Sequence, residues 1–471
     1  MVKIIINNLF IMVGVIISFL NLFLPISNEK KKLKVRSIKI NNMTKIFGII
    51  GLVVLTLGLA LYLIVDKYRE PVPQKNVNTL KLSDTIGTSI HELQGTTDFT
   101  SIKSYGITTV RDALVWNIIE REKGKYKFNN NGTINYDNFI EKFEVNKLRP
   151  YLMLLYTNNL YGENKALDNP EIKEAYSNWA AACAARYKNK NIIWEIYNEP
   201  NGGFWTPQNN SSINYTDAVK RTAPLIKRND PSGMVVAPAL AGAGEIPLMW
   251  LEETFKEGIL EYIDAVSVHP YRHNNPETVI ADYKKIRALI SKYTDKDIPI
   301  ISGEWGYSSL SNWNGKGNNA VVSSQVIQAQ YLTRMFLINH SQNISLTIWY
   351  DWKNDGNDKI NVENNFGLLK SDQLTPKQSV IALKTLSDTL SNYKFYKRIN
   401  IGNNKDYIFK YVNEKSQVAY AFWTTDNDHY FVLKDEVKGR IINMLGEESE
   451  IKGKNITLPL TKSPSYIVNE H

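Results

Sequence analysis

The sequence predicts an α/β fold: a (β/α)₈ barrel with a small C-terminal antiparallel β-sandwich, preceded by two transmembrane helices. Three observations support this prediction. Two long apolar stretches lie near the N-terminus, short apolar strands then alternate with amphipathic helices, and the last part of the chain holds only short segments rich in β-forming residues. We therefore divide the chain into two spans with a basic loop (1–65), a tether (66–79), a catalytic barrel (80–392) and a β-sandwich (393–471).

The N-terminal part contains two candidate membrane spans. Residues 4–26 and 46–65 carry no charged side chain, and each is long enough for the roughly 20 apolar residues that cross a bilayer. A cleaved signal peptide is the alternative for the first stretch, but the apolar run is too long and no small-x-small site follows it. The loop between the spans is basic, with Lys30, Lys31, Lys32, Lys34, Arg36, Lys39 and Lys45.

This charge pattern predicts the topology. Basic loops stay in the cytoplasm, so both chain ends and the barrel should lie outside the cytoplasmic membrane of a bacterium, with membrane lipid as a partner. The tether contains Pro71 and Pro73, which stiffen it. Much of the formal net charge of +9 lies in the loop. Because no nucleic-acid-binding motif accompanies it, we do not expect nucleic acid as a partner.

The barrel prediction rests on alternation, since parallel strands need helical crossovers. The predicted strands are residues 85–90, 108–114, 151–155, 192–197, 234–237, 265–268, 298–301 and 346–349. The predicted helices are residues 97–105, 136–147, 170–187, 215–227, 247–256, 276–293, 323–339 and 376–391. Eight such pairs are typical of a (β/α)₈ barrel. An open doubly wound sheet is the alternative, but no Gly-x-Gly-x-x-Gly motif follows the first strand.

Beyond residue 391 the pattern changes to short β segments separated by turn residues, which predicts the antiparallel β-sandwich. These segments are residues 407–412, 418–424, 430–433, 440–443, 456–459 and 465–468.

Two glutamates follow predicted barrel strands. The fourth strand runs into Glu199 within an Asn-Glu-Pro motif, and the seventh runs into Glu304 within Gly-Glu-Trp. Chemistry in these barrels lies at the C-terminal ends of the strands, so the two carboxyl groups should face each other across the barrel mouth. Glycoside hydrolysis needs such a pair, one protonated and the other ionised.

Together with His-Pro-Tyr at residues 269–271, these motifs resemble the clan of (β/α)₈ retaining glycosidases that carry glutamates on strands four and seven. The resemblance covers about residues 80–471 and is closest to glycoside hydrolase families 39 and 5. The stretch Trp-Tyr-Asp-Trp-Lys-Asn-Asp-Gly at 349–356, followed by Asn-Phe-Gly-Leu at 365–368, is similar to family 39 hydrolases of biofilm exopolysaccharide. A membrane-anchored endoglucanase encoded with an exopolysaccharide operon fits the resemblance equally well.

The resemblance implies Glu199 as the acid/base and Glu304 as the nucleophile. Arg111 would keep Glu304 ionised, and Asn198 would bind the sugar 2-hydroxyl. His269 and Tyr271 would orient Glu304 and the sugar, and Trp349 would be the platform under the −1 sugar. Weaker candidates for stacking along a groove are Trp116, Tyr156, Trp205, Trp305, Tyr307 and Trp313.

Other polar residues have simpler interpretations. Glu195 lies inside the fourth strand, and we expect it to be structural. Glu92 is equally compatible with substrate contact and with a solvated loop. The single cysteine, Cys183, fits a buried helix better than a catalytic thiol. A loop with Asp355, Asp358 and Glu363 lacks the spacing of an EF-hand. We therefore expect no bound metal and no cofactor.

The sequence thus predicts a retaining endo-β-glycosidase that acts on a β-linked polysaccharide, with a cellulose-like β-1,4-glucan as the first expectation. Other exopolysaccharides, xylan and mannan remain open as substrates. A barrel that binds glycan without cutting it, or that serves as a scaffold in an exopolysaccharide synthase complex, is the alternative from another functional class.

Overall fold

The computed structural model describes residues 79–91, 97–129, 134–310 and 320–470, which belong to one compact unit, residues 76–471. Both predicted spans, their basic loop and nearly all of the tether lie outside the described residues, as do Glu92 and Trp313. Among the described residues, no helix has the length and apolar character needed to cross a membrane.

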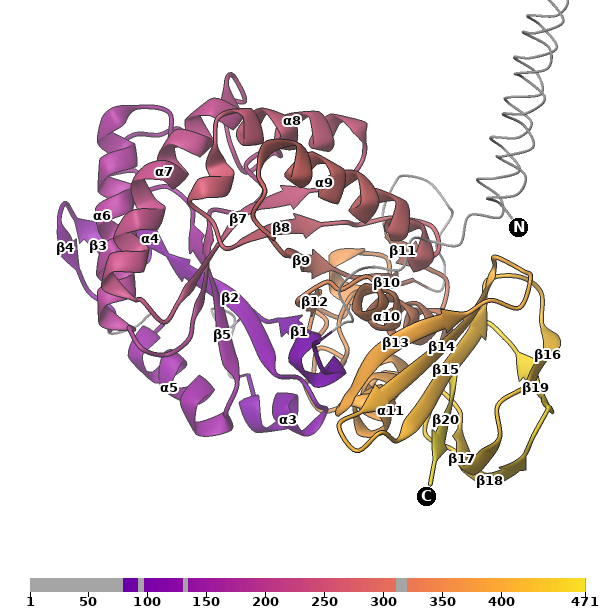
Figure 1. Cartoon of the computed structure of the whole chain (residues 1–471). Helices are drawn as coiled ribbons and strands as arrows, with labels where there is room; N and C mark the ends of the chain where they lie inside the picture. Colours follow the sequence, from indigo (N-terminus) through magenta and orange to yellow (C-terminus); the bar gives the residue numbers. More distant parts are fainter. Residues whose placement is uncertain (1–78, 92–96, 130–133, 311–319, 471) are drawn as a thin grey trace, which may run out of the picture. The chain divides into compact units, whose positions relative to one another are not determined.

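Eight parallel strands close into a barrel in the order β1-β12-β9-β8-β7-β6-β5-β2, with helices around the outside (Figure 1). The strands are β1 (Ile86–Ser89), β2 (Thr109–Val115), β5 (Arg149–Leu155), β6 (Ile193–Ile196), β7 (Met234–Ala241), β8 (Ala265–His269), β9 (Ile300–Trp305) and β12 (Thr347–Trp349). The barrel closes where Gly87 of β1 pairs with both Ile348 and Thr109. All eight predicted strands are therefore present, and the predicted barrel is confirmed.

The helices match the predicted positions to within a few residues. They are α3 (Phe99–Ser104), α5 (Tyr136–Asn146), α6 (Pro170–Arg186), α7 (Ser211–Asn229), α8 (Glu245–Lys256), α9 (Val279–Tyr293), α10 (Gln325–Ser341) and α11 (Gln378–Leu390). Local sequence explains where several begin: Asp98 caps α3 through two backbone N–H groups, and Asn169 caps α6 just before a proline at the first helical position.

Shorter elements join these units. They are η1 (Leu82–Thr85), α4 (Trp116–Ile119), β3 (Glu120–Glu122), β4 (Lys125–Tyr126), η3 (Ile259–Glu261), η4 (Pro276–Thr278), β10 (Ser308–Ser309), β11 (Val321–Val322) and η5 (Glu363–Asn365).

The C-terminal part is an antiparallel sandwich. A six-stranded sheet has the order β13-β14-β15-β20-β17-β18, and a second sheet pairs β16 with β19. The strands are β13 (Tyr393–Ile399), β14 (Asp406–Asn413), β15 (Val418–Thr424), β16 (His429–Leu433), β17 (Val437–Ile442), β18 (Glu448–Gly453), β19 (Ile456–Leu460) and β20 (Ser465–Asn469). Two of them, β13 and β18, have no counterpart among the predicted segments.

The two faces of strand β14 pack into two different apolar cores. Ile408 packs into the sandwich interior together with Phe431 and Leu458 of the smaller sheet. Its neighbours Tyr407 and Phe409 point the other way, because side chains alternate along a strand, and join the apolar core of the barrel helices. A buried hydrogen bond also joins the two parts, since the indole nitrogen of Trp423 donates to Glu277 at 2.7 Å.

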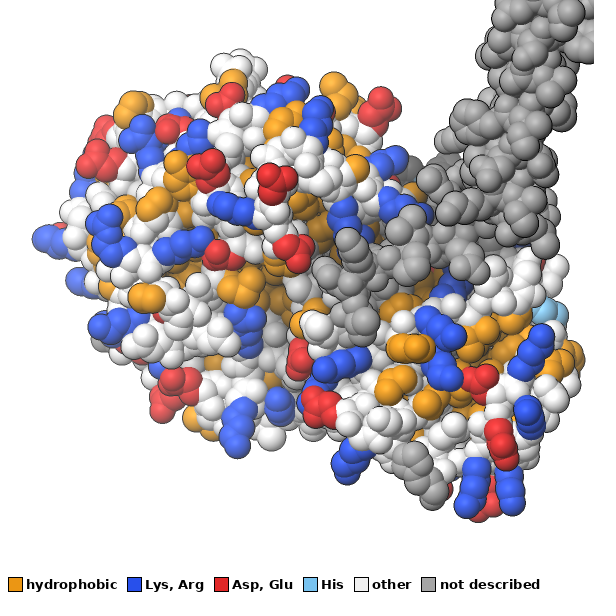
Figure 2. Space-filling view, in the orientation of Figure 1, with side chains coloured by type: hydrophobic (Ala, Val, Ile, Leu, Met, Phe, Trp, Pro, Cys, Tyr) orange, Lys and Arg blue, Asp and Glu red, His pale blue; other side chains and the backbone are white. Residues whose placement is uncertain are grey.

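The described surface carries charged side chains of both signs. Figure 2 shows basic and acidic side chains interspersed over the visible face of the barrel, without a single large basic patch.

Candidate active site

The chain makes a strained turn immediately after β6, and this turn carries Asn198 and Glu199. The backbone φ is +66° at Tyr197 and +50° at Glu199, a left-handed conformation that costs a residue with a side chain about 1–2 kcal/mol. Two hydrogen bonds hold the turn: the Glu199 N–H donates to Ala239 at 3.2 Å, and the Gly202 N–H donates to Glu199 at 2.9 Å. Strain that the surrounding structure maintains in this way is a feature of functional sites.

Glu304 lies at the end of β9 and is held by two donors. Arg111 Nη1 lies 2.5 Å from Glu304 Oε2, and the Tyr271 hydroxyl donates to Oε1 at 2.9 Å. Gly303 precedes it, and a Cβ there would lie only 2.2 Å from Ser267 Oγ. A side chain at position 303 would therefore displace Ser267 Oγ, which donates to the buried Glu195 at 2.6 Å.

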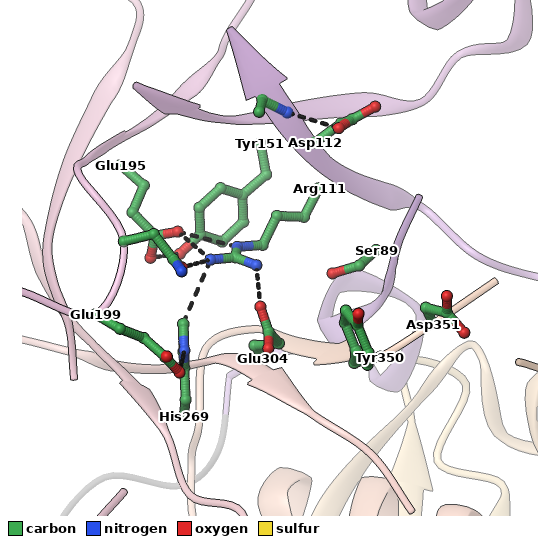
Figure 3. A network of polar contacts seen from close by, with 12 residues as sticks. Ser89, Arg111, Asp112, Tyr151, Glu195, Glu199, His269, Glu304, Tyr350 and Asp351 are labelled. Atoms are coloured by element: carbon green, nitrogen blue, oxygen red, sulfur yellow. Dashed lines mark hydrogen bonds and ion pairs between the residues drawn. The ribbon is translucent and has the colours of Figure 1, made fainter. Parts of the chain in front are cut away.

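Arg111, at 1% exposure, is the centre of the network (Figure 3). Its Nε and Nη2 donate to Glu195 Oε2 at 2.9 and 2.7 Å, and Nη2 also donates to Asn198 Oδ1 at 2.8 Å. Glu195 is fully buried and also accepts a hydrogen bond from Tyr151 at 2.6 Å. Its position therefore fits the structural role expected from the sequence.

Glu199 pairs with His269 across the mouth. His269 Nδ1 lies 2.8 Å from Glu199 Oε1, so this histidine contacts Glu199 directly. The sequence analysis expected it to orient Glu304 and the sugar, and a His269 nitrogen also lies within 4.8 Å of a Glu304 oxygen. A carboxylate oxygen of Glu199 and one of Glu304 lie within 4.8 Å of each other. Both side chains keep some contact with solvent, at 19% and 16% exposure.

The electrostatics favour an ionised Glu304. Burial acts to raise its pKa, but the nearby charges of His269 and Arg111 and the hydrogen bonds from Tyr271 and Arg111 outweigh burial, so the pKa lies below its ordinary value. Burial and the charge of Glu304 raise the pKa of Tyr271 well above its ordinary value. Tyr271 therefore keeps its proton and remains a donor.

Most aromatic side chains expected to stack on sugar are buried, which corrects that expectation. Trp205, Trp305 and Trp349 each have 0% exposure, and so offer no face to a sugar ring. Trp205 packs edge-on against Tyr197 and Tyr215, the Arg272 guanidinium lies 5.2 Å from the Trp305 ring centre, and the Trp349 indole donates to the Phe366 carbonyl at 3.3 Å. Trp116 and Tyr307 are also buried.

Tyr350, one residue after Trp349, is a further aromatic residue beside Glu304 (Figure 3). Its ring is only partly buried and packs edge-on against His91, with ring centres 5.6 Å apart. The sequence interpretation missed it because two aromatic residues end the eighth strand together, and sequence does not show which one faces the mouth.

A second polar cluster lies behind Tyr350, at the ends of β1 and β12. His91 Nδ1 lies 2.9 Å from Asp355 Oδ1 and 3.8 Å from the buried Asp351. Burial lowers the pKa of His91, but the hydrogen bond to Asp355 and the charges of Asp351 and Asp355 outweigh it and raise the pKa to about 9. The sequence interpretation did not single out His91 or Asp351.

Two groups among the described residues bring ligand atoms within 4.8 Å of one another: His91 with Asp351 and Asp355, and Glu199 with His269 and Glu304. In each group the histidine already contacts a carboxylate directly. Asp355, Asp358 and Glu363 do not form such a group. Asp358 instead accepts the Ile360 N–H at 2.9 Å.

Solved structures share this fold. A family 39 glycoside hydrolase from the gut symbiont Bacteroides cellulosilyticus WH2 superposes with a TM-score of 0.70 at 22% identity, covering 84% of this chain and 83% of that one. A monomeric β-xylosidase from Caulobacter crescentus CB15 gives 0.58 at 15%, covering 82% and 95%. A family 30 endoxylanase from Clostridium papyrosolvens C71 gives 0.57 at 12%, covering 84% and 98%.

No curated protein matches the chain in sequence. A family model does match, over residues 65–356, and it describes the cellulases of glycosyl hydrolase family 5. The match spans most of the barrel, including both glutamates and the network around Arg111. The chain therefore belongs to the cellulase family, glycosyl hydrolase family 5.

Proposed function

We propose that this glycoside hydrolase is a retaining endo-β-glycosidase in which Glu304 is the nucleophile and Glu199 the acid/base. The observation that carries the proposal is that a carboxylate oxygen of Glu199 and one of Glu304 lie within 4.8 Å of each other. Retaining enzymes hold their carboxyl groups about 5–5.5 Å apart, whereas inverting enzymes leave about 6.5–9.5 Å for a water molecule.

In the first step, an oxygen of Glu304 attacks the anomeric carbon and the glycosidic C–O bond breaks. Glu199 gives its proton to the departing oxygen, so the leaving sugar departs neutral. The bonds from Arg111 and Tyr271 suit Glu304 to this role, because they favour its ionised form. The side-chain oxygen of Asn198 accepts a hydrogen bond from Arg111. Its NH₂ group has only a long contact of 3.4 Å to the Tyr156 hydroxyl and can therefore donate to the sugar.

In the second step, Glu199 takes a proton from water while the water oxygen attacks the anomeric carbon. The ester bond to Glu304 breaks, and the product keeps the β configuration because each step inverts it once. His269 supports both steps, since it holds Glu199 in place whether that residue gives or takes the proton.

A β-1,4-glucan is the first substrate that we propose, because the family model that matches is that of the cellulases. Xylan is the second, because two of the similar folds belong to a β-xylosidase and an endoxylanase. Other exopolysaccharides and mannan rank after these two as proposed substrates. A scaffold that binds glycan without cutting it is a weaker alternative, since it would not require the network that prepares Glu304.

The experiment incubates the full-length protein with cellulose-type glucan, xylan and mannan, and identifies the products by mass spectrometry. Hydrolysis of one polysaccharide to a ladder of oligosaccharides supports endo action on that glycan. Release of single sugars alone would contradict endo action. Glu304→Gln should reduce turnover of every substrate by at least about 10³-fold. Binding without hydrolysis by the wild-type protein would favour the scaffold.

We also propose that the barrel works outside a bacterial cytoplasmic membrane, anchored in lipid by residues 4–26 and 46–65. Their apolar sequence and the basic loop between them support this placement. An enzyme so placed would meet exopolysaccharide as it leaves the cell, and an exopolysaccharide synthase complex is then a natural partner.

A further inference from the structure

We infer that Phe204 is the binding platform for the first sugar of the leaving group, the +1 sugar. The inference rests on the proposed function and adds a substrate-binding residue to it. No sequence motif points to Phe204. Its role follows from a rigid loop, an open aromatic face and a position beside the proposed acid/base.

The loop between β6 and α7 is held at several points. The Tyr197 hydroxyl lies 2.8 Å from the carbonyl oxygens of both Phe204 and Lys165, and the Gln208 amide donates to the Trp205 carbonyl at 2.8 Å. The Trp205 ring is buried beneath the loop. The backbone around Phe204 is therefore fixed by side chains on both sides of it.

Phe204 nevertheless has 44% of its surface exposed. One face of its ring stacks on Tyr156, with ring centres 5.2 Å apart and planes 7° from parallel. A Cβ at the preceding residue, Gly203, would lie in open space, so nothing in the described structure crowds the neighbouring backbone. An apolar ring held rigidly in this way fits the apolar face of a sugar, which aromatic side chains bind by stacking.

The position of Phe204 assigns it to the leaving-group side. Gly202, two residues earlier, donates its N–H to the Glu199 carbonyl, and Tyr156 beneath the ring contacts Asn198 at 3.4 Å. Glu199 must reach the oxygen that joins the cleaved sugar to the leaving group. Glu304 must reach the anomeric carbon, and its strand β9 is separated from β6 by β7 and β8. The side of the mouth formed by β5 and β6 therefore receives the leaving group.

The test compares two leaving groups in the full-length protein. Cellopentaose leaves a sugar that reaches Phe204, while β-cellobiosyl fluoride leaves a single fluoride ion that does not. Phe204→Ala should lower kcat/KM on cellopentaose about ten-fold, a typical value for losing one stacking contact, and leave the fluoride rate within about two-fold. Xylopentaose and β-xylobiosyl fluoride form the second pair, for use if xylan is the substrate.

Two further variants test whether the flat ring of Phe204 is what binds the sugar. Phe204→Trp keeps a flat ring and should retain the rate on the pentasaccharide, whereas Phe204→Leu keeps apolar packing on Tyr156 but lacks a flat face and should resemble the alanine variant. Leucine also serves if the alanine variant fails to fold. Val145→Ala, which truncates an exposed apolar residue in α5, is the control and should change neither rate.

Equal losses on both substrates would overturn the inference, because they would mean that Phe204 supports Glu199 and does not bind the leaving group. Unchanged rates on both would also overturn it. Failure of the proposed function has a different result: the wild-type protein would then hydrolyse none of the polysaccharides in the panel and neither member of either pair.

Discussion

Arg111 Nη1 lies 2.5 Å from Glu304 Oε2, and the other nitrogens of the same guanidinium bind the buried Glu195. One cation therefore neutralises a structural carboxylate and also stabilises the ionised form of the proposed nucleophile. The rigid fork of arginine allows both, since it presents several donors in fixed directions. A lysine at this position would keep the charge and lose that geometry.

Arg111→Lys should therefore shift the pH dependence of activity. Activity needs ionised Glu304 and falls as the pH drops through its pKa, which the network holds below the ordinary value. Weaker bonding raises that pKa, so the acidic limb of the kcat/KM profile should move to higher pH by about one unit. Arg186→Lys, at an exposed ion pair with Asp137, is the control and should leave the profile in place. A lower rate with an unmoved limb would mean that Arg111 does not tune Glu304.

Glu199→Ala should impair substrates according to their leaving group. Hydrolysis of polysaccharide should fall by at least about 10²-fold, whereas an activated aryl glycoside should lose little in the first step because its leaving group needs no proton. Added azide should restore turnover by attacking the intermediate from the vacated side, and mass spectrometry and NMR should identify a β-glycosyl azide. An α-glycosyl azide, or no rescue at all, would contradict the acid/base assignment.

Chelation should not abolish activity. The proposed mechanism uses two carboxylates and needs no metal, and the histidines of both candidate cation groups already contact carboxylates. Rates measured before and after dialysis against EDTA should agree. Complete loss that a single divalent metal restores would instead make His91, Asp351 and Asp355 the first residues to examine.

The topology can be tested with protease. Because the basic loop should stay inside, protease added to intact cells or protoplasts should degrade the barrel without lysis. A cytoplasmic protein followed in the same samples controls for leakage. Protection of the barrel until the cells are lysed would show that the topology proposed from residues 4–26 and 46–65 is incorrect.

The sequence predicted the buried strands of the barrel but missed two exposed strands of the sandwich. All eight barrel strands are apolar enough to stand out, because a parallel sheet is covered on both faces. By contrast, β13 and β18 are the two edges of the six-stranded sheet. Charged residues such as Lys397 and Glu450 interrupt them. Edge strands avoid further pairing by carrying charge, and the same property hides them from a search for apolar segments.

The sequence predicts the charged residues of the candidate site better than its aromatic residues, for a physical reason. Glu199 and Glu304 follow from strand ends, since barrel geometry alone brings those positions together, whereas Arg111 lies within β2 (Thr109–Val115). Aromatic residues carry no such signal, because tryptophan serves equally well as core and as sugar platform. The Trp205 ring is buried beneath the loop, whereas Phe204 beside it is exposed. That outcome depends on how the loop packs, which strand periodicity does not encode.

The anomeric configuration of the first-formed product tests the central claim most directly. Proton NMR can follow the reaction on cellopentaose, or on xylopentaose if xylan is the substrate, before the product mutarotates. Double displacement through Glu304 predicts that the β-anomer appears first and that the α-anomer grows in only later, at the rate of spontaneous mutarotation. An α-anomer that appears first would mean a single displacement by water, and Glu304 would then not be the nucleophile.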